Sequence, residues 1–447
     1  MIFVDPQYVE FEPGAQIPQL IQYTQPPLFR QTKSNVCLWY SAAMRLLFVA
    51  DGRSTTALSW LEAWTGSGAE THLVSTYPCD PPPGLKSFHI LPVAFSWMLK
   101  PSKKQHSSGK TNNGNFNGMR NQLRPFRSVA GPFSLPFYQT RFRNIVKEIH
   151  PELVHALRIP FEGMLANSTP RGIPLVVSVW GNDITLHAHS SIFMAALTRK
   201  TLRRADGLIA DAHRDIRLGV EWGFTAGNPT LVVPGAGGIR LDEMETVPGL
   251  ENLPEKLADV PIVVNPRGQR PGSLRQDIFF QAIPLVVEKC PQAQFICPNL
   301  EGDAEAEHWV QSLGIRLNTK LWPRLERSQM WRLYKKAEIF VSPSVHDGTP
   351  NSLLEAMASG CLPVVGNIES MQEWVNPGVN GLLVDATNPM DLANGIIFAL
   401  QNPKLRESAK KENARIIAER ATYERCMAMT EAFYKQILKE FPGGNPV

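Results

Sequence analysis

Short runs of apolar residues alternate with longer amphipathic stretches along most of the chain. The run Arg45-Leu-Leu-Phe-Val-Ala50 has the length and residue types of a strand buried on both faces, and Asp51-Gly52 ends it. Further strands are expected near 70–75, 87–92, 151–155, 174–180, 206–210 and 230–233, with helices near 54–66, 136–148 and 191–205. This alternation predicts a parallel sheet covered by helices on both faces.

A second series of the same kind begins after a segment rich in Pro and Glu, 243–258. Its strands are expected near 261–265, 293–297, 338–342 and 362–366, and its helices near 276–288, 303–313, 326–336, 351–359, 388–400 and 404–438. The pattern predicts an α/β protein with two Rossmann-like, doubly wound parallel-sheet domains that face a cleft. Ligands of such sheets bind at the carboxyl ends of the strands.

The length of 447 residues suits two domains of about 200 residues each. We expect an N-terminal Rossmann-like domain at 44–242 and a C-terminal Rossmann-like domain at 259–403. Helices at 404–447 are expected to pack back toward the N-terminal domain. Residues 1–43 show no period and are expected to be a poorly ordered extension, with Met44 a candidate for the natural start.

The stretch 100–131 interrupts the alternation with Gly, Asn, Ser and Lys, and we expect a long mobile loop there. It lies within 81–147, which holds eleven Lys and Arg but no Asp or Glu, although the net charge of the chain is only +4. Two interpretations stay open: a surface attracted to an anionic membrane or acceptor, and a solvated loop. Nucleic acid is not an expected partner, because the loop offers few aromatic side chains for stacking on bases.

The six cysteines show neither a CxxC pair nor the spacing of metal ligands, and we find no secretory signal. No apolar run reaches the ~18 residues that a membrane-spanning helix needs. We therefore expect reduced thiols in a cytoplasmic protein, with any membrane contact peripheral.

The most informative stretch is 339–360, in which a buried strand leads through a polar turn into a helix of small residues. The free N–H groups and the dipole of that helix N-terminus favour an anion such as a diphosphate. Asp347 and Glu355 are eight residues apart, so both carboxylates can face one cleft and accept hydrogen bonds from sugar hydroxyls. Ser352-Leu-Leu-Glu355 also fits a capping box, which leaves a purely structural role for Glu355 open.

These residues resemble the retaining glycosyltransferases of the GT-B fold, and among them family 4, the glycosyl transferases group 1. The segment PSVHDGTPNSLLEAMASGCLPVV follows the E-x7-E region of that family, with Asp347 in place of the first Glu. The resemblance implies that Glu355 holds the ribose hydroxyls of a nucleotide and Asp347 the hydroxyls of a donor sugar, both as catalytic-site residues. The backbone around four further residues would contact sugar and phosphate: Gly348, Thr349, Pro350 and Asn351.

The same resemblance places cationic side chains on the donor diphosphate. Arg267, Arg270 and Arg275 follow an expected strand, where the family carries an Arg and a Lys, and which of the three takes each role stays open. Fixed cations balance the charge that develops on a leaving nucleoside diphosphate. The chain has no D-x-D, the carboxylate pair with which metal-dependent transferases hold a divalent cation. No metal is therefore expected.

The N-terminal half resembles the family more weakly. The turn after the first strand resembles its glycine loop, so Gly52 and Ser54 are expected to contact the donor. The segment 177–184 resembles a turn in which Asp183 would face the acceptor or the reacting end of the donor, with Trp180 where the family often has His. His189 and His187 are candidates to replace that histidine, or are simply surface residues.

Two further stretches match the family by position. The segment 322–325 is expected near the base, with packing as the alternative role for Trp322. The glycine-containing run 234–239 resembles the turn between the family's domains, a hinge for closure around substrates.

The function that this resemblance implies is transfer of a hexosyl group from a UDP- or GDP-sugar to an acceptor hydroxyl, with retention of configuration. The acceptor would be a glycan, a lipid-linked molecule or a small molecule, and the donor would be a substrate, with no separate cofactor. Two alternatives stay open: a nucleotide-sugar epimerase of the same fold, and a degenerate protein that binds nucleotide sugars without catalysis.

Overall fold

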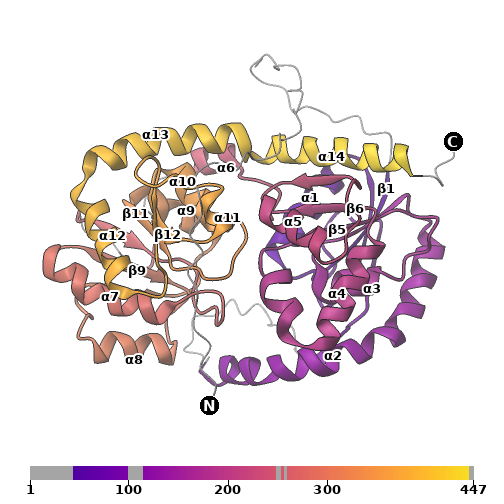
Figure 1. The fold of residues 1–447 in the computed structure, drawn as a ribbon, viewed down its shortest axis with the longest axis horizontal. Coiled ribbons are helices and arrows are strands. Elements are labelled where there is room, and N and C mark those ends of the chain that lie inside the picture. The colour runs from indigo at the N-terminus through magenta and orange to yellow at the C-terminus, as the bar shows by residue number, and fades with distance from the viewer. Residues whose placement is uncertain (1–43, 99–113, 248–252, 256–258, 442–447) are drawn as a thin grey trace, which may run out of the picture. The chain divides into compact units, whose positions relative to one another are not determined.

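Seven parallel strands form the first sheet, in the order β3-β2-β1-β4-β5-β6-β7 (Figure 1). In chain order they are β1 (Arg45–Ala50), β2 (Glu70–Ser75), β3 (Ser87–Ile90), β4 (Leu153–Ala156), β5 (Leu175–Val179), β6 (Gly207–Ala210) and β7 (Thr230–Val232). β1 lies between β2 and β4, and every residue of it after Arg45 is buried. Such complete burial is typical of a strand covered on both faces.

The computed structural model describes residues 44–98, 114–247, 253–255 and 259–441, and only the backbone of 114–126. The expectation for 1–43 lies outside these ranges. The helices of the first sheet are α1 (Thr55–Gly66), α2 (Gly114–Ile149), α3 (Met164–Ala166), α4 (Ile192–Arg204) and α5 (His213–Glu221). α1 begins where the Ser54 side chain accepts a hydrogen bond from the Ala57 N–H, and its Trp60 and Trp64 side chains are buried.

The mobile loop expected at 100–131 is wrong for its second part, because 114–131 belongs to α2. The rest of that stretch lies outside the described residues. Gly131 indicated a loop, yet it is a close-packing residue: a Cβ there would lie 2.8 Å from the Phe161 ring and 2.9 Å from the Ala94 methyl. The neighbouring Ser134 hydroxyl accepts the Ala94 N–H at 2.8 Å and fixes the same approach.

The second sheet has six parallel strands in the order β10-β9-β8-β11-β12-β13. In chain order they are β8 (Ile262–Val264), β9 (Gln294–Pro298), β10 (Thr319–Trp322), β11 (Ile339–Ser342), β12 (Leu362–Gly366) and β13 (Leu382–Val384). The helices around them are α7 (Gln276–Lys289), α8 (Ala304–Ser312), α9 (Arg327–Lys336), α10 (Asn351–Ser359), α11 (Glu369–Gln372) and α12 (Pro389–Gln401), and α6 (Leu241–Thr246) precedes the sheet. The chain thus has the fold of two Rossmann-like, doubly wound domains.

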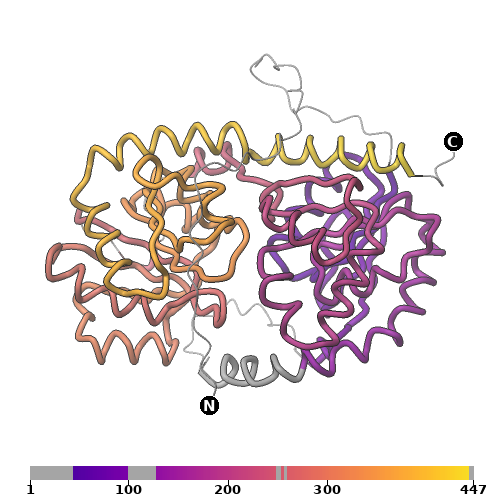
Figure 2. The backbone as a smooth tube through the Cα atoms, in the orientation of Figure 1, coloured from indigo at the N-terminus to yellow at the C-terminus, as the bar shows by residue number. Residues whose placement is uncertain are grey.

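The helical stretch expected at 404–438 is two helices, α13 (Pro403–Arg420) and α14 (Tyr423–Glu440) (Figure 2). Ile239 interrupts them: its N–H donates to the Ala421 carbonyl at 2.7 Å, and its carbonyl accepts the Tyr423 N–H at 2.9 Å. α13 buries Ile417 in the C-terminal core. α14 joins the N-terminal core through Cys426, Phe433, Tyr434 and Ile437.

Candidate functional site

Asp347 follows β11 and is buried, with 8% of its surface exposed. Its carboxylate forms an ion pair with Arg267 and also accepts the Gly348 N–H at 3.1 Å. Arg267 lies in the turn after β8, the strand beside β11 in the sheet. The two residues are 80 positions apart in the chain and meet because neighbouring parallel strands end at the same edge.

Glu355 lies on α10 and faces Arg327, whose Nε is 3.6 Å from Oε1 of Glu355. The capping box considered for Ser352 does not form, because α10 begins at Asn351 with Pro350 as its N-cap residue. Burial raises the pKa of the Glu355 carboxyl. Glu355 thus lies in the second turn of α10, where it pairs with Arg327 and caps no helix.

The three arginines considered for a diphosphate differ in their surroundings. Arg267 is buried against Asp347, whereas the Arg270 Nε is 3.4 Å from the carbonyl oxygen of Arg267. Arg275 precedes α7 and binds the Asp277 carboxylate, with Nη2 to Oδ2 at 2.7 Å. Arg267 is therefore the one that the structure brings to Asp347.

The turn after Asp347 contacts strand-end turns of the first sheet. A Cβ at Gly181, just after β5, would overlap the backbone of Gly348. A Cβ at Gly348 would in turn overlap the carboxylate of Asp211, the residue after β6. Two glycines therefore allow these turns to touch.

Thr349 and Asn351 extend the same contact. The Thr349 hydroxyl donates to the Asp211 carbonyl and accepts the Trp374 indole N–H at 2.8 Å. The Asn351 side-chain oxygen accepts the Ala236 N–H at 3.3 Å. In the described arrangement these polar groups bind protein partners in both domains.

Asp211 itself was not singled out from the sequence. It is 7% exposed, its Oδ1 has no hydrogen-bond partner, and burial raises its pKa well above the ordinary value, with Asp215 and Asp347 adding repulsion. Burial also raises the pKa of Asp215 to about 6, although Arg214 lies against it. A carboxylate placed directly after a buried strand was the available sequence signal.

Asp183 is completely buried, and its carboxylate is bound by groups of the protein. It pairs with Arg158, with Nη2 to Oδ1 at 2.7 Å, and accepts the N–H groups of Ile159 and Trp180. The Arg158 side chain remains 30% exposed. Arg158, which follows β4, is thus the group that Asp183 positions at the strand ends.

A cavity of about 100 Å³ opens at these strand ends. Its lining includes Ala50, Asp51, Ser54, Leu157, Arg158, Glu162 and Trp180. Glu162 is buried, binds the Thr76 hydroxyl at 2.6 Å, and has its pKa raised by burial. Ser54 reaches this cavity in addition to capping α1, and Gly52 has a packing reason of its own, since a Cβ there would lie 2.6 Å from the Cys79 sulfur.

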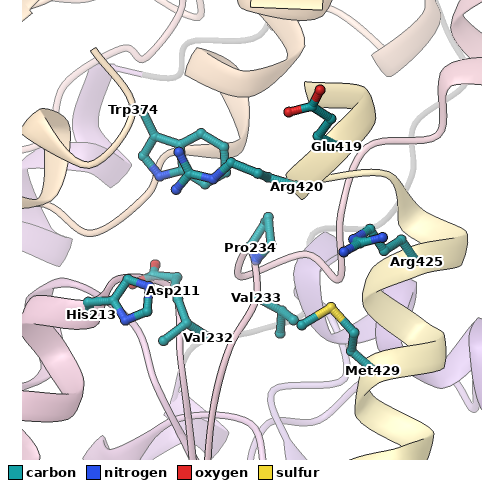
Figure 3. Close-up of a pocket in the computed structure, with 10 residues that line it drawn as sticks. All are labelled: Asp211, His213, Val232, Val233, Pro234, Trp374, Glu419, Arg420, Arg425 and Met429. Carbon is teal, nitrogen blue, oxygen red and sulfur yellow. The ribbon is translucent and has the colours of Figure 1, made fainter. Parts of the chain in front are cut away.

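A second cavity, of about 180 Å³, lies where α13 meets α14 (Figure 3). Its lining residues are Asp211, His213, Val232, Val233 and Pro234, then Trp374, Glu419 and Arg420, and Arg425 and Met429 of α14. The Arg420 guanidinium stacks on the Trp374 indole, with 4.2 Å from its carbon to the ring centroid. Neither this lining nor that of the smaller cavity includes Asp347 or Glu355.

Two other candidate residues make contacts within the protein. Trp322 is buried on β10, and its indole N–H donates to the Glu255 carboxylate at 2.9 Å. His189 contacts the Trp222 ring edge-on, with centroids 5.0 Å apart. Within the described ranges no group of three or more His, Cys, Asp or Glu side chains could hold a metal ion.

Two family models match the chain. The model for "Glycosyl transferases group 1" matches residues 275–416, and that for "Glycosyl transferase 4-like domain" matches residues 51–235. The first match contains Asp347 and Glu355, and the second contains Asp183.

Curated relatives match shorter segments. An uncharacterised glycosyltransferase of Methanocaldococcus jannaschii is 25% identical over 36% of this chain and 41% of its own length. The N,N'-diacetylbacillosaminyl-diphospho-undecaprenol alpha-1,3-N-acetylgalactosaminyltransferase of Campylobacter jejuni is 36% identical over 20% of this chain and 23% of its own. The D-inositol 3-phosphate glycosyltransferase of Thermobifida fusca is 29% identical over 24% of this chain and 26% of its own length. The matches thus span less than half the length of each of these relatives.

Solved structures share the fold over most of the chain. Sucrose-phosphate synthase from Thermosynechococcus elongatus superposes with a TM-score of 0.66 and 16% identity, covering 88% of this chain and 99% of the other. Anabaena HepE in complex with UDP gives a TM-score of 0.64 and 15% identity, and the superposition covers 88% of this chain and 100% of the HepE chain.

Proposed function

The chain belongs to the glycosyl transferases group 1 of the GT-B fold, and we propose that it transfers a hexosyl group from a nucleotide sugar to an acceptor hydroxyl. The observation that carries the proposal is the pairing of buried Asp347 with Arg267 at the turn that leads into α10. A carboxylate suited to sugar hydroxyls and a cation suited to a diphosphate lie there side by side. Glu355, in the second turn of that helix, supplies a second carboxylate.

The donor takes over the contacts that these residues now make with each other. Its diphosphate replaces Asp347 as the partner of Arg267, and its sugar hydroxyls bind the released Asp347 carboxylate. Arg267 then stabilises the negative charge of the leaving nucleoside diphosphate, without a metal ion or a separate cofactor. Asp183 acts through Arg158, which it holds at the strand ends of the acceptor side.

Retention of configuration follows from the resemblance to retaining GT-B enzymes. No side chain at the site is an evident nucleophile, so we infer attack by the acceptor on the donor face that the diphosphate leaves. The catalytic contribution of the protein is then positioning and charge stabilisation.

UDP is the first nucleotide to test, because Anabaena HepE has been solved with UDP and with UDP-glucose, and GDP is the second. The acceptor is a glycan or a lipid-linked glycan. The Campylobacter relative, named for a diphospho-undecaprenol acceptor, supports the lipid-linked class. Among the described residues, no helix is long and apolar enough to cross a membrane. We place the protein in the cytoplasm with peripheral membrane contact through 81–147.

The test is a panel of UDP-, GDP- and ADP-sugars in a thermal unfolding assay. A ligand that binds only the folded state raises the melting temperature, by an increment that grows with its concentration relative to Kd. We expect one nucleotide class to stabilise the wild type and to lose its effect in Glu355→Ala. If no nucleotide sugar stabilises the protein, the proposed donor site is wrong.

Product analysis separates the proposal from its alternatives. A transferase converts the stabilising donor to the free nucleoside diphosphate, and proton NMR shows the starting anomeric configuration in the product. An epimerase instead yields an isomerised sugar nucleotide, and a binding protein leaves the donor intact. Unchanged turnover in EDTA supports a reaction without a metal.

A further inference from the structure

An apolar row lies exposed on α2. Val129, Phe133 and Phe137 follow one another at intervals of four residues and are 49%, 65% and 68% exposed. Residues at this spacing lie on one face of a helix. Two exposed phenylalanines one turn apart are unusual on a surface that meets only water.

The neighbouring helix α4 continues this apolar surface. Its first residues, Ile192 and Phe193, are 80% and 38% exposed. The rings of Phe193 and Phe133 meet edge to face, with centroids 4.9 Å apart. Helices α2 and α4 contact each other, and Figure 1 shows them side by side. We call these five residues, Val129, Phe133, Phe137, Ile192 and Phe193, the α2–α4 face.

Basic side chains lie next to the α2–α4 face on both helices. On α2, Arg141 continues the row one turn after Phe137, and Arg143 and Lys147 are also exposed. On α4, the exposed basic residues are Arg199, Lys200 and Arg203, and that helix has no Asp or Glu. The first acidic residue of α2 is Glu148, at its last turn.

We propose that the α2–α4 face docks on the surface of an anionic phospholipid bilayer. Aromatic and aliphatic side chains with adjacent Lys and Arg are the composition that binds the interface between acyl chains and anionic headgroups. A second copy of this chain fits poorly, because a two-fold contact would bring like basic charges against each other. The inference deepens the proposed function by placing the acceptor at a membrane. In that one point it rests on the proposed function, whereas the docking itself does not depend on it.

The experiment is co-sedimentation of the full chain with vesicles of phosphatidylcholine alone and of phosphatidylcholine with phosphatidylglycerol. We expect binding to the anionic vesicles that weakens with added salt and is at least ~10-fold weaker for phosphatidylcholine, from the attraction of several basic groups. Phe133→Ser/Phe137→Ser should lower the partition coefficient at least ~10-fold, since each phenylalanine loses an apolar contact with lipid. The matched control is Phe398→Ser, at a phenylalanine that is 50% exposed on α12 in the other domain.

A second variant, Arg141→Gln/Arg143→Gln/Lys147→Gln, tests the charges without altering the apolar row and should also lose binding to anionic vesicles. Equal binding by wild type and the double serine variant would overturn the proposal. The proposal would also be overturned if the wild type did not bind the vesicles but formed a dimer in sedimentation velocity that the double serine variant did not form. The rise in melting temperature with nucleotide sugars is measured on the same variants. It stays unchanged if only the membrane contact is lost. It is absent from the wild type if the proposed donor site is wrong.

Discussion

Gly181 and Gly348 lie backbone against backbone, at a separation that leaves no room for a Cβ on Gly181. They belong to different domains, at the ends of β5 and β11. The Asn182 amide supports the same contact by donating to the Ser273 hydroxyl at 2.8 Å. The turn predicted to bind the donor is therefore in direct contact with the N-terminal domain.

Gly181→Ala is expected to push the two turns apart and to lower kcat/KM by about 5- to 150-fold, since an added methyl in a tight contact costs about 1–3 kcal/mol. The measurement is initial rate with the stabilising donor, alongside the melting temperature. Gly172→Ala is the matched control, because nothing lies within 4 Å of a Cβ there. Full activity in Gly181→Ala would mean that this contact has no part in the reaction.

Arg267→Ala is expected to weaken nucleotide-sugar binding by about 10- to 100-fold, the value of one charge-assisted hydrogen bond at about 1.5–3 kcal/mol. It also leaves Asp347 without its cation, so the unliganded melting temperature should fall. Arg275→Ala serves as the comparison, since its charge is already paired with Asp277 on the protein surface. Calorimetric titration with the nucleoside diphosphate measures both, and equal losses would make the assignment of Arg267 wrong.

Glu373 supplies the N-terminal cap that α5 lacks. Ala212 precedes this helix and has no capping oxygen, while the Glu373 carboxylate accepts the N–H groups of His213 and Arg214 at 2.9 and 3.0 Å. Glu373→Ala should lower the free energy of unfolding by about 0.5–2 kcal/mol, the usual cost of a lost cap. In Glu369→Ala the loss should be smaller, because the ion pair of Glu369 with Arg217 is exposed on both sides. Urea unfolding followed by circular dichroism compares the two.

The burial of His155 makes the stability of the fold sensitive to acid. It is buried between the Ser178 hydroxyl at 2.8 Å and the Tyr434 hydroxyl at 2.5 Å, and burial lowers its pKa from 6.5 to about 3. The unfolded chain therefore binds a proton that the folded chain does not, so stability is complete above pH 6.5 and falls as the pH drops toward 3.

Between pH 6.5 and pH 5 this one group should cost about 1–2 kcal/mol of unfolding free energy. Unfolding in urea at several pH values measures the slope. His155→Gln should lower stability near neutral pH and reduce the slope below it. An unchanged slope in that variant would assign the acid sensitivity to other groups.

The sequence predicted strand and helix positions well where the apolar period was strong. β1, β2, β12 and α10 begin and end at the predicted residues, because each carries an unbroken buried run or a helix start next to proline. β10 and α5 were missed. β10 is a short strand with two partly exposed residues, and α5 lacks the capping side chain that marks a helix start.

The residues of the candidate site could be predicted from the sequence more readily than the side chains with which they pair. Asp347 and Glu355 stand out from their spacing and from the resemblance, which remain the basis of their roles. The ion pair of Arg267 with Asp347 depends on strand order, which brings residues 80 positions apart to one sheet edge. Asp211 offered only its position directly after a buried strand, because its contact with Gly348 of the other domain cannot be read from the sequence.

The bridge between Ile239 and Thr422 joins two passages of the chain between the domains. Gly238 makes this possible, because a Cβ there would lie 2.8 Å from the Thr422 carbonyl oxygen. At this point the two passages are hydrogen-bonded to each other through their backbones. Any rotation of one domain relative to the other must therefore turn about this bridge or break its backbone hydrogen bonds.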